Sequence, residues 1–140
     1  MHNKQKGFTL IELMVVIALI ALLASVILAS VRTAGAKGRD AARRENLSAV
    51  KLALELNFND SNSFPPGDEV DWATLSSPLS SFLPSGVPTD PVDAWPEPLY
   101  KSTGSVYSIY MQYESGVSCK TGGSGVDPAW FGATVPFCEQ

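Results

Sequence analysis

Glu12 is the side chain whose position most needs a chemical explanation, because it is the only charge in the apolar run of residues 8–31. A carboxylate deep in hydrocarbon costs about 2.5–3.5 kcal/mol even on lenient insertion scales, and less near the end of a run. A cationic partner would offset this cost. The sequence therefore predicts either an interfacial Glu12 whose carboxylate reaches water or a Glu12 that binds a positive charge.

Cys119 and Cys138 are the only cysteines, and both lie in the last quarter of the chain. A cysteine pair in a protein tethered to a membrane suits a disulfide formed in an oxidising compartment. On the loop-entropy model, closing the segment between them would stabilise the folded state by roughly 3 kcal/mol. Two unrelated thiols are the alternative.

The apolar run spans 24 residues, about 36 Å as a helix, which is long enough to cross a bilayer with some tilt. A removable secretory signal has a shorter apolar region of roughly 7–15 residues, although residues 34–36 are small enough to mimic its cleavage site. An ordinary membrane anchor is a second explanation, and Glu12 is a penalty for it. The third explanation is a segment whose amino-terminal end is chemically processed.

Residues 6–12, Lys-Gly-Phe-Thr-Leu-Ile-Glu, resemble the processing motif of type IV prepilins and type II secretion pseudopilins. The resemblance implies that a membrane peptidase cuts between Gly7 and Phe8 and that the new amino terminus of Phe8 is methylated. It also implies that Glu12, the fifth residue of the mature chain, faces the cationic amine of Phe8 on a neighbouring subunit of a filament.

The function implied by the resemblance is structural. The subunit would be stored in the membrane and processed by the prepilin peptidase. An assembly ATPase, acting through an inner-membrane platform protein, would then extract it into a filament with copies of itself or sister pilins.

We expect a type IV pilus-like filament, which the cysteine-closed tail favours. A pseudopilin that drives export in a type II secretion system is the alternative, which calcium-dependent folding would favour. A monomeric membrane-anchored binding module is a third hypothesis, and it predicts neither processing at Gly7 nor filaments.

The implied location is the cytoplasmic membrane, crossed once, with the C-terminal domain outside the cytoplasm and later in an extracellular or periplasmic filament. Counting basic residues favours the opposite orientation, because two lysines precede the run and five cations follow it within residues 32–44. We base the predicted orientation on the motif and the cysteine pair.

Residues 52–140 hold two basic and eleven acidic side chains, which gives no reason to expect specific nucleic-acid binding.

The predicted fold is α+β and pilin-like, with one long amino-terminal helix packed on a small antiparallel sheet. We expect a leader of residues 1–7, a membrane-spanning and filament-core helix of residues 8–31, and a globular domain of residues 32–140. The helix should continue to about residue 59, because residues 33–58 contain no proline and many good helix formers. Gly35 and Gly38 are its weak points.

The outer part of this helix has two apolar faces. One face holds Leu47, Val50, Leu54 and Phe58, and the other holds Ala49, Leu52, Ala53 and Leu56. A helix of a single soluble domain normally buries one stripe, so the second face should be covered either by another subunit or by loops of the same domain.

The sheet is expected at about residues 99–121. Its clearest strand is 106–114, in which alternate residues should face the helix: Tyr107, Ile109, Met111 and Tyr113. Strands near 99–102 and 117–121 would flank it through turns at Gly104 and Gly116.

Residues 66–98 are expected to form an ordered loop, with short helices near 72–75 and 79–83. Residues 122–140 should form a glycine-rich loop closed by the disulfide. The tryptophans are expected in the core rather than on an adhesive surface: Trp72, Trp95 and Trp130.

Enzymatic chemistry is not expected, because the only histidine is His2, inside the leader whose removal the resemblance predicts. Calcium could bind at the acidic cluster of residues 68–71, formed by Asp68, Glu69 and Asp71. Asp127 beside the glycine-rich loop resembles the calcium loop of major pseudopilins, and this resemblance implies a second possible site. Calcium needs six to eight oxygen ligands, so a solvated acidic surface is the interpretation we favour, and no cofactor is expected.

Overall fold

The structure, a computed structural model, describes residues 7–122 and 125–138. The chain divides into two compact units, Met1–Ala36 and Lys37–Gln140. Residues 1–6 of the predicted leader, which include His2, Lys4 and Lys6, lie outside the described residues.

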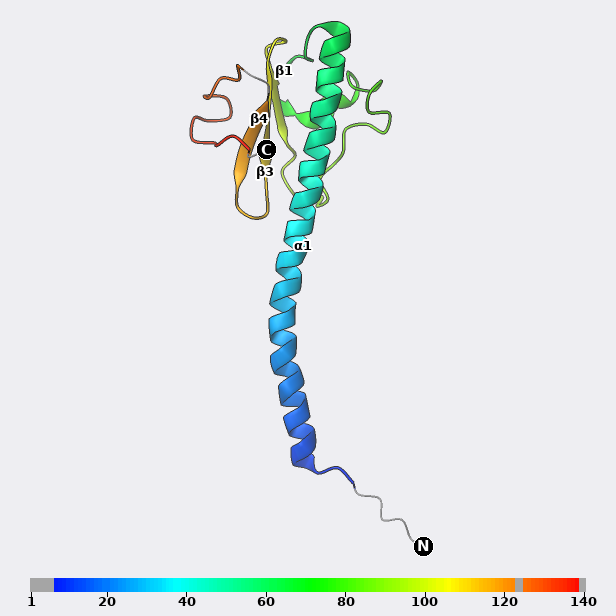
Figure 1. Cartoon of the computed structure of the whole chain (residues 1–140), viewed down its shortest axis with the longest axis vertical. Helices are drawn as coiled ribbons and strands as arrows, with labels where there is room; N and C mark the ends of the chain where they lie inside the picture. The colour runs from blue at the N-terminus through cyan, green and yellow to red at the C-terminus, as the bar shows by residue number, and fades with distance from the viewer. Residues whose placement is uncertain (1–6, 123–124, 139–140) are drawn as a thin grey trace. The chain divides into compact units, whose positions relative to one another are not determined.

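A single helix, α1 (Leu10–Ser61), contains the apolar run from residue 10 onward and continues beyond it (Figure 1), so it begins two residues later than the predicted start at residue 8. It runs through Gly35 and Gly38 without a break and ends two residues beyond the predicted end. Asn62, in the left-handed conformation at φ 55°, caps it by donating its N–H to the carbonyl of Phe58 at 2.7 Å. By length and composition α1 can cross a membrane, and its most apolar window buries none of its surface within the chain. That surface is available to lipid or to other helices.

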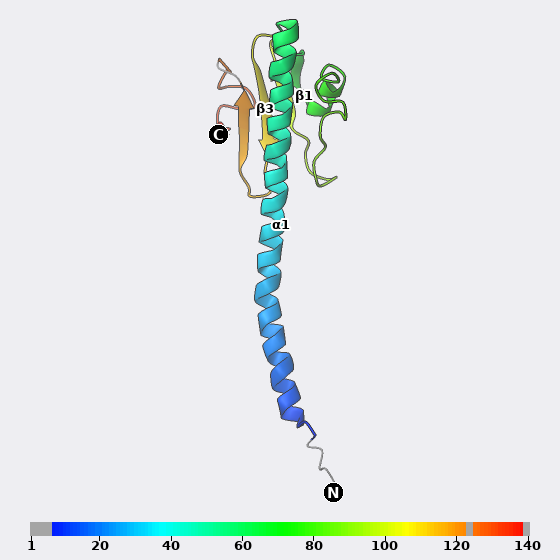
Figure 2. The same cartoon turned by 45° about the vertical axis from the view of Figure 1, so that its right-hand side comes forward.

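Four strands form an antiparallel sheet in the order β1 (Gly67–Asp71), β2 (Leu99–Ser102), β3 (Tyr107–Gln112) and β4 (Ser118–Gly122). The two predicted hairpin turns are present, with Gly104 and Gly116 at φ 87° and 83°, a conformation that glycine adopts without a steric penalty. Figure 2 shows β4 and β1 on opposite sides of the C-terminal part of α1, which lies over one face of the sheet.

Strand β1 was not predicted, and the expectation of a loop from residue 66 onward is wrong at this point. Its sequence, Gly-Asp-Glu-Val-Asp, has no apolar alternation, and it pairs with β2 through a register shift between Gly67 and Val70. Glu69 takes a positive φ of 54° at this irregularity. The 3-10 helix η1 (Trp72–Ser76) agrees with the first short helix that we expected, whereas residues 79–83 form turns instead of the second.

The core lies between α1 and the sheet. The α1 residues Leu47, Val50 and Leu54 are buried. So are the four residues that were predicted to face the helix from the third strand: Tyr107, Ile109, Met111 and Tyr113. Trp72 is also buried, but Trp95 and Trp130 are only half-buried, so the prediction of a core position is wrong for these two.

The assignment of residues to the two faces of α1 agrees with the structure except at one residue. Ala53 was assigned to the outer face, but it is buried in the core with an exposed fraction of 2%. Leu52 and Leu56 are 62% and 43% exposed, so no loop of the described domain covers them.

Candidate functional site

The start of α1 holds the residues predicted to be processed. Gly7, Phe8 and Thr9 precede the helix in non-helical backbone, and the Phe8 side chain is 92% exposed. A Cβ placed on Gly7 would meet no atom within 4 Å. The peptide bond between Gly7 and Phe8 is therefore open to a peptidase.

Thr9 and Glu12 form a reciprocal cap on the first turn of α1. The Glu12 Oε2 atom accepts hydrogen bonds from the Thr9 backbone N–H at 2.9 Å and from the Thr9 hydroxyl at 2.8 Å. The Glu12 N–H donates in return to Thr9 Oγ1 at 3.3 Å. This is a capping box, in which two otherwise unpaired N–H groups are satisfied by side chains.

The capping box gives Glu12 a partner within its own chain, which the sequence-based alternatives did not include. The carboxylate also lies at the positive end of the helix dipole, which favours negative charge. Its acceptor atom binds the N–H of Thr9, the residue directly after Phe8, so it lies one residue from the nitrogen that cleavage would turn into an amine. Pairing between Glu12 and the Phe8 amine of another subunit stays a prediction.

In the second unit, five charged side chains form what we call the arginine cluster: Arg39, Asp40, Arg43, Asp90 and Glu114. Arg43 is at its centre and is 2% exposed. Its Nε and Nη2 atoms donate to the two Asp90 carboxylate oxygens at 2.6 and 2.8 Å, and Nη1 donates to Asp40 and Glu114 at 2.8 and 3.1 Å. Arg39 adds a second bidentate pair with Glu114, at 2.7 and 2.6 Å.

The cluster connects segments that are far apart in sequence. Asp40 accepts the backbone N–H groups of Glu114 and Ser115, so it fixes the turn after β3 to α1. Asp90 fixes the long connection before β2 in the same way. The Arg43 guanidinium also lies 4.7 Å from the centre of the Trp95 ring, which accounts for the half-buried position of that tryptophan.

The contacts of the cluster shift the pKa values of its members. Hydrogen bonds from Arg39, opposed by partial burial and reinforced by Arg43, lower the pKa of Glu114 to about 2. Burial opposes ionisation of Asp40, but the N–H groups of Glu114 and Ser115 and the Arg43 guanidinium outweigh it and lower the pKa of Asp40. The hydrogen bonds from Arg43 to Asp90 raise the pKa of the arginine despite its burial.

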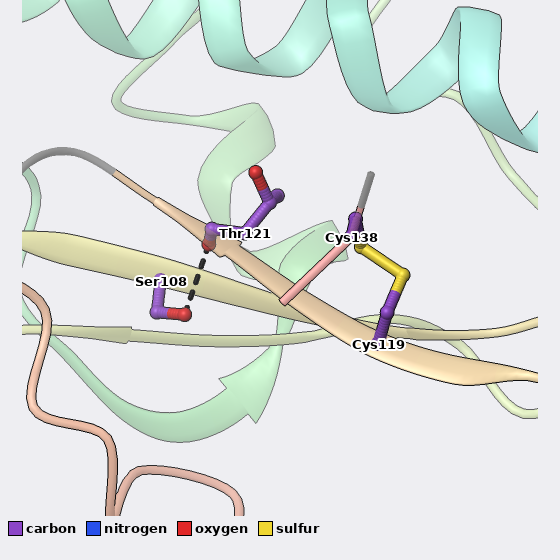
Figure 3. The surroundings of a disulfide bond; sticks show 4 residues. All are labelled: Ser108, Cys119, Thr121 and Cys138. Carbon is purple, nitrogen blue, oxygen red and sulfur yellow. Dashed lines mark hydrogen bonds between the residues drawn. A yellow bond between two sulfur atoms is a disulfide. The ribbon is translucent and has the colours of Figure 1, made fainter. Parts of the chain in front are cut away.

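The carboxyl-terminal segment returns beside β4 and is joined to it by a disulfide between Cys119 and Cys138, the pair predicted from the sequence (Figure 3). The bridge lies between hydrogen bonds of the backbone, from Lys120 N–H to Pro136 O and from Cys138 N–H to Lys120 O, both at 2.9 Å. Ser108 on β3 donates its hydroxyl to the carbonyl of Thr121, which explains why this outward residue is also buried.

Lys120 organises the loop before the disulfide. Its side chain is 1% exposed, and its ammonium group donates to the carbonyl oxygens of Pro128, Trp130 and Gly132 at 2.5–3.1 Å. Three converging carbonyls form a site for a cation, and here the cation is part of the chain.

The acids considered for calcium binding have other contacts. Lys101 pairs with Asp68 at 2.7 Å and with Glu69 at 3.3 Å. Asp71 caps η1 by accepting the N–H of Ala73, and Asp127 accepts the N–H of Ala129. No three metal-binding side chains come together among the residues that the structure describes.

Comparisons of the sequence with known proteins support the processing motif at the start of α1. Residues 2–28 match the family model described as the prokaryotic N-terminal methylation motif. The type II secretion system core protein G of Pseudomonas aeruginosa is 26% identical over 132 residues, covering 90% of this chain and 93% of that protein. In its amino-terminal motif and over most of its length, this chain is similar to proteins of the type IV pilin and pseudopilin family.

Two further pseudopilins are similar to this pilin-like chain. The proteins named type II secretion system core protein G in Dickeya chrysanthemi and Pectobacterium carotovorum subsp. carotovorum are 27% and 28% identical over 101 and 98 residues. These alignments cover 68% and 66% of this chain and 66% and 63% of the two proteins. No solved structure gives a significant match.

Sequence reasoning missed two sets of residues in this pilin-like chain. The arginine cluster could not be predicted, because Asp90 and Glu114 lie 47 and 71 residues from Arg43. Lys120 did carry a signal, since it is one of only two basic residues after residue 51. A rare cation in an acidic part of the chain favours a specific internal role.

Proposed function

We propose that this chain is a structural subunit of a pilin-like filament, cleaved between Gly7 and Phe8 and methylated on the Phe8 nitrogen. The observation that carries the proposal is the Thr9–Glu12 capping box, which lies directly behind an exposed Gly7–Phe8 bond within the matched methylation motif. The chain's role is mechanical rather than enzymatic.

The mechanism follows from two groups at the start of α1, the Phe8 nitrogen and the Glu12 carboxylate. Cleavage converts the Phe8 amide nitrogen into an amine that is cationic at neutral pH, beside a carboxylate that the cap already holds in place. Before assembly, lipid covers the apolar surface of α1 and Glu12 binds only Thr9. In the filament, neighbouring helices replace the lipid, and the Phe8 amine of one subunit offsets the burial of Glu12 on another.

The partners follow from this mechanism. The prepilin peptidase acts at Gly7, and an assembly ATPase working through an inner-membrane platform protein supplies the energy for extraction. The membrane span leaves the domain after residue 36 outside the cytoplasm, where the Cys119–Cys138 disulfide can form.

We further propose that the filament is a secretion pseudopilus. The support is that each of the three similar proteins reported above is named as a type II secretion system core protein, one of them alignable over nearly both full chains. A surface pilus is the second candidate, favoured by the disulfide that closes the carboxyl-terminal segment.

A deletion experiment in the native host separates the two candidates. If the chain is a pseudopilin, its loss stops release of secreted enzymes into the medium and leaves surface pili unchanged in electron micrographs. If surface pili disappear while secretion continues, the pilus assignment replaces the pseudopilus. Re-expression of the chain in the deletion strain is the control.

A further inference from the structure

Exposed apolar side chains in the second unit gather in two places. Among the described residues of this unit, four large apolar side chains are exposed, by 43–62%: Leu52, Leu56, Val117 and Phe137. The first two lie on α1, and the other two lie on the β3–β4 turn and the carboxyl-terminal segment. Soluble domains rarely leave grouped apolar side chains uncovered without an interaction that uses them.

The first place is a stripe on α1 that we call the ridge: Glu45, Ala49, Leu52 and Leu56. Their spacing of four, three and four residues puts them on one side of the helix, turned away from the buried Val50 and Leu54. Glu45 is exposed, and it has no ion-pair partner in the part of the chain that the structure describes. The ridge therefore presents two leucines and one free carboxylate.

The second place is an open groove of about 1000 Å³ between α1 and β4, which we call the β4 groove. Val117 and Phe137 line it from the sheet side, and Arg44, Ser48 and Lys51 line it from α1. Figure 2 shows β4 and the carboxyl-terminal segment together on one side of α1. The Arg44 guanidinium lies 5.0 Å from the centre of the Tyr113 ring, and neither Arg44 nor Lys51 has an acidic partner within the described ranges.

We infer that the ridge of one copy of this chain docks into the β4 groove of the next copy. The apolar parts match, since Leu52 and Leu56 would cover Val117 and Phe137. The charges match as well, because Glu45 would meet Arg44 and Lys51, two cations that have no acidic partner among the described residues. Electrostatic complementarity of this kind fixes register and excludes wrong partners.

The two surfaces are different, and this determines the kind of assembly. Contact between unlike surfaces cannot close as a two-fold dimer, and it propagates into a helical filament when the rotation between successive copies does not close a ring. The inference rests on the proposed function, because it assigns the contact between domains in the same filament.

Cysteine cross-linking in the full-length chain tests the inference. A variant that carries both Leu52→Cys and Val117→Cys, expressed in the native host and oxidised, should give a ladder of dimers, trimers and longer species on non-reducing gels. Each single variant is a matched control that should give no ladder, because it has only one half of the contact. A dimer from either single variant would show a two-fold contact and overturn the inference.

A charge variant gives an independent readout. Lys51→Glu should reduce the yield of sheared filaments at least several-fold, while Ser81→Glu, a change at an exposed residue outside both the groove and the arginine cluster, should not. Normal yield from Lys51→Glu, or filaments without a ladder from the double-cysteine chain, would overturn the docking inference and leave the filament function standing. Absence of filaments and of processing in the unmodified chain would overturn both.

Discussion

Arg43 and Asp90 form a bidentate ion pair with N–O distances of 2.6 and 2.8 Å, and their side chains are only 2% and 4% exposed. The two residues lie 47 positions apart, so this pair joins the helix to the long segment between η1 and β2. Since a buried charge is stable only with its partner, the pair holds the segment around Asp90 against the part of α1 that carries Arg43.

Replacing Arg43 tests the arginine cluster. Arg43→Met should lower the free energy of unfolding by about 3–5 kcal/mol, because it leaves the buried Asp90 and Asp40 without their cation. Arg39→Met is the matched control. Since the Arg39 side chain is 40% exposed, its loss should cost at most about 1 kcal/mol. Urea unfolding of the full-length chain in detergent, followed by near-ultraviolet circular dichroism, measures both, and equal costs would contradict the account.

Acid should weaken the domain in a defined pH range. The pKa of Glu114 is lowered to about 2 in the folded chain, so its contribution to stability is fully present above the ordinary pKa of about 4.3 in the unfolded chain and is lost as the pH falls toward 2. The lowered pKa of Asp40 acts in the same direction.

Glu114→Gln should therefore be less stable than the unmodified chain at pH 7 and should lose less stability between pH 5 and pH 2. Glu45→Gln, on the exposed ridge, should retain the acid sensitivity. Thermal unfolding midpoints across this range give the comparison, and an unchanged pH profile for Glu114→Gln would argue against the cluster as the cause.

Lys120→Met should loosen the carboxyl-terminal loop. Each carbonyl that loses its donor and stays out of contact with water costs about 1–3 kcal/mol, and Lys120 serves three of them. Because an internal ammonium already fills this site, adding millimolar calcium or a chelator should leave the unfolding midpoint of the unmodified chain unchanged. A calcium-induced rise of several degrees would contradict this reading of the loop.

Glu12 and Thr9 should have separable effects. Glu12→Leu should leave membrane insertion intact but prevent filament assembly, since the Phe8 amine would be buried without a counter-ion at a cost of about 3–5 kcal/mol per contact. Thr9→Ala removes only a helix cap, worth about 0.5–2 kcal/mol, so assembly should be reduced but not abolished. Sheared filament yield and membrane content, measured on the same cells, distinguish the two, and normal filaments from Glu12→Leu would contradict the proposed pairing.

Local patterns predicted the parts of the fold that depend on local physics. The long helix followed from composition and the absence of proline, and the burial of Tyr107, Ile109 and Met111 followed from alternation. Strand β1 was missed because its sequence is acidic and lacks alternation, and only pairing with β2 makes it a strand. Ala53 was assigned to the wrong face because alanine is small enough to fit either one.

The candidate site was predictable at the amino terminus because its motif is contiguous. The capping box could have been read from the Thr9 to Glu12 spacing, which is the sequence signature of this cap. The arginine cluster and the cradle of carbonyls around Lys120 depend on residues brought together only by folding. Backbone carbonyls also leave no trace in residue types, so the Lys120 site had no sequence pattern beyond the isolated positive charge.

The mass of the mature amino terminus tests the central claim most directly. Mass spectrometry of the chain purified from its native host should give a polypeptide that begins at Phe8 and carries one methyl group on its terminal nitrogen. A chain that still begins at Met1 would lack the amine that Glu12 is proposed to bind, and would contradict the account of assembly.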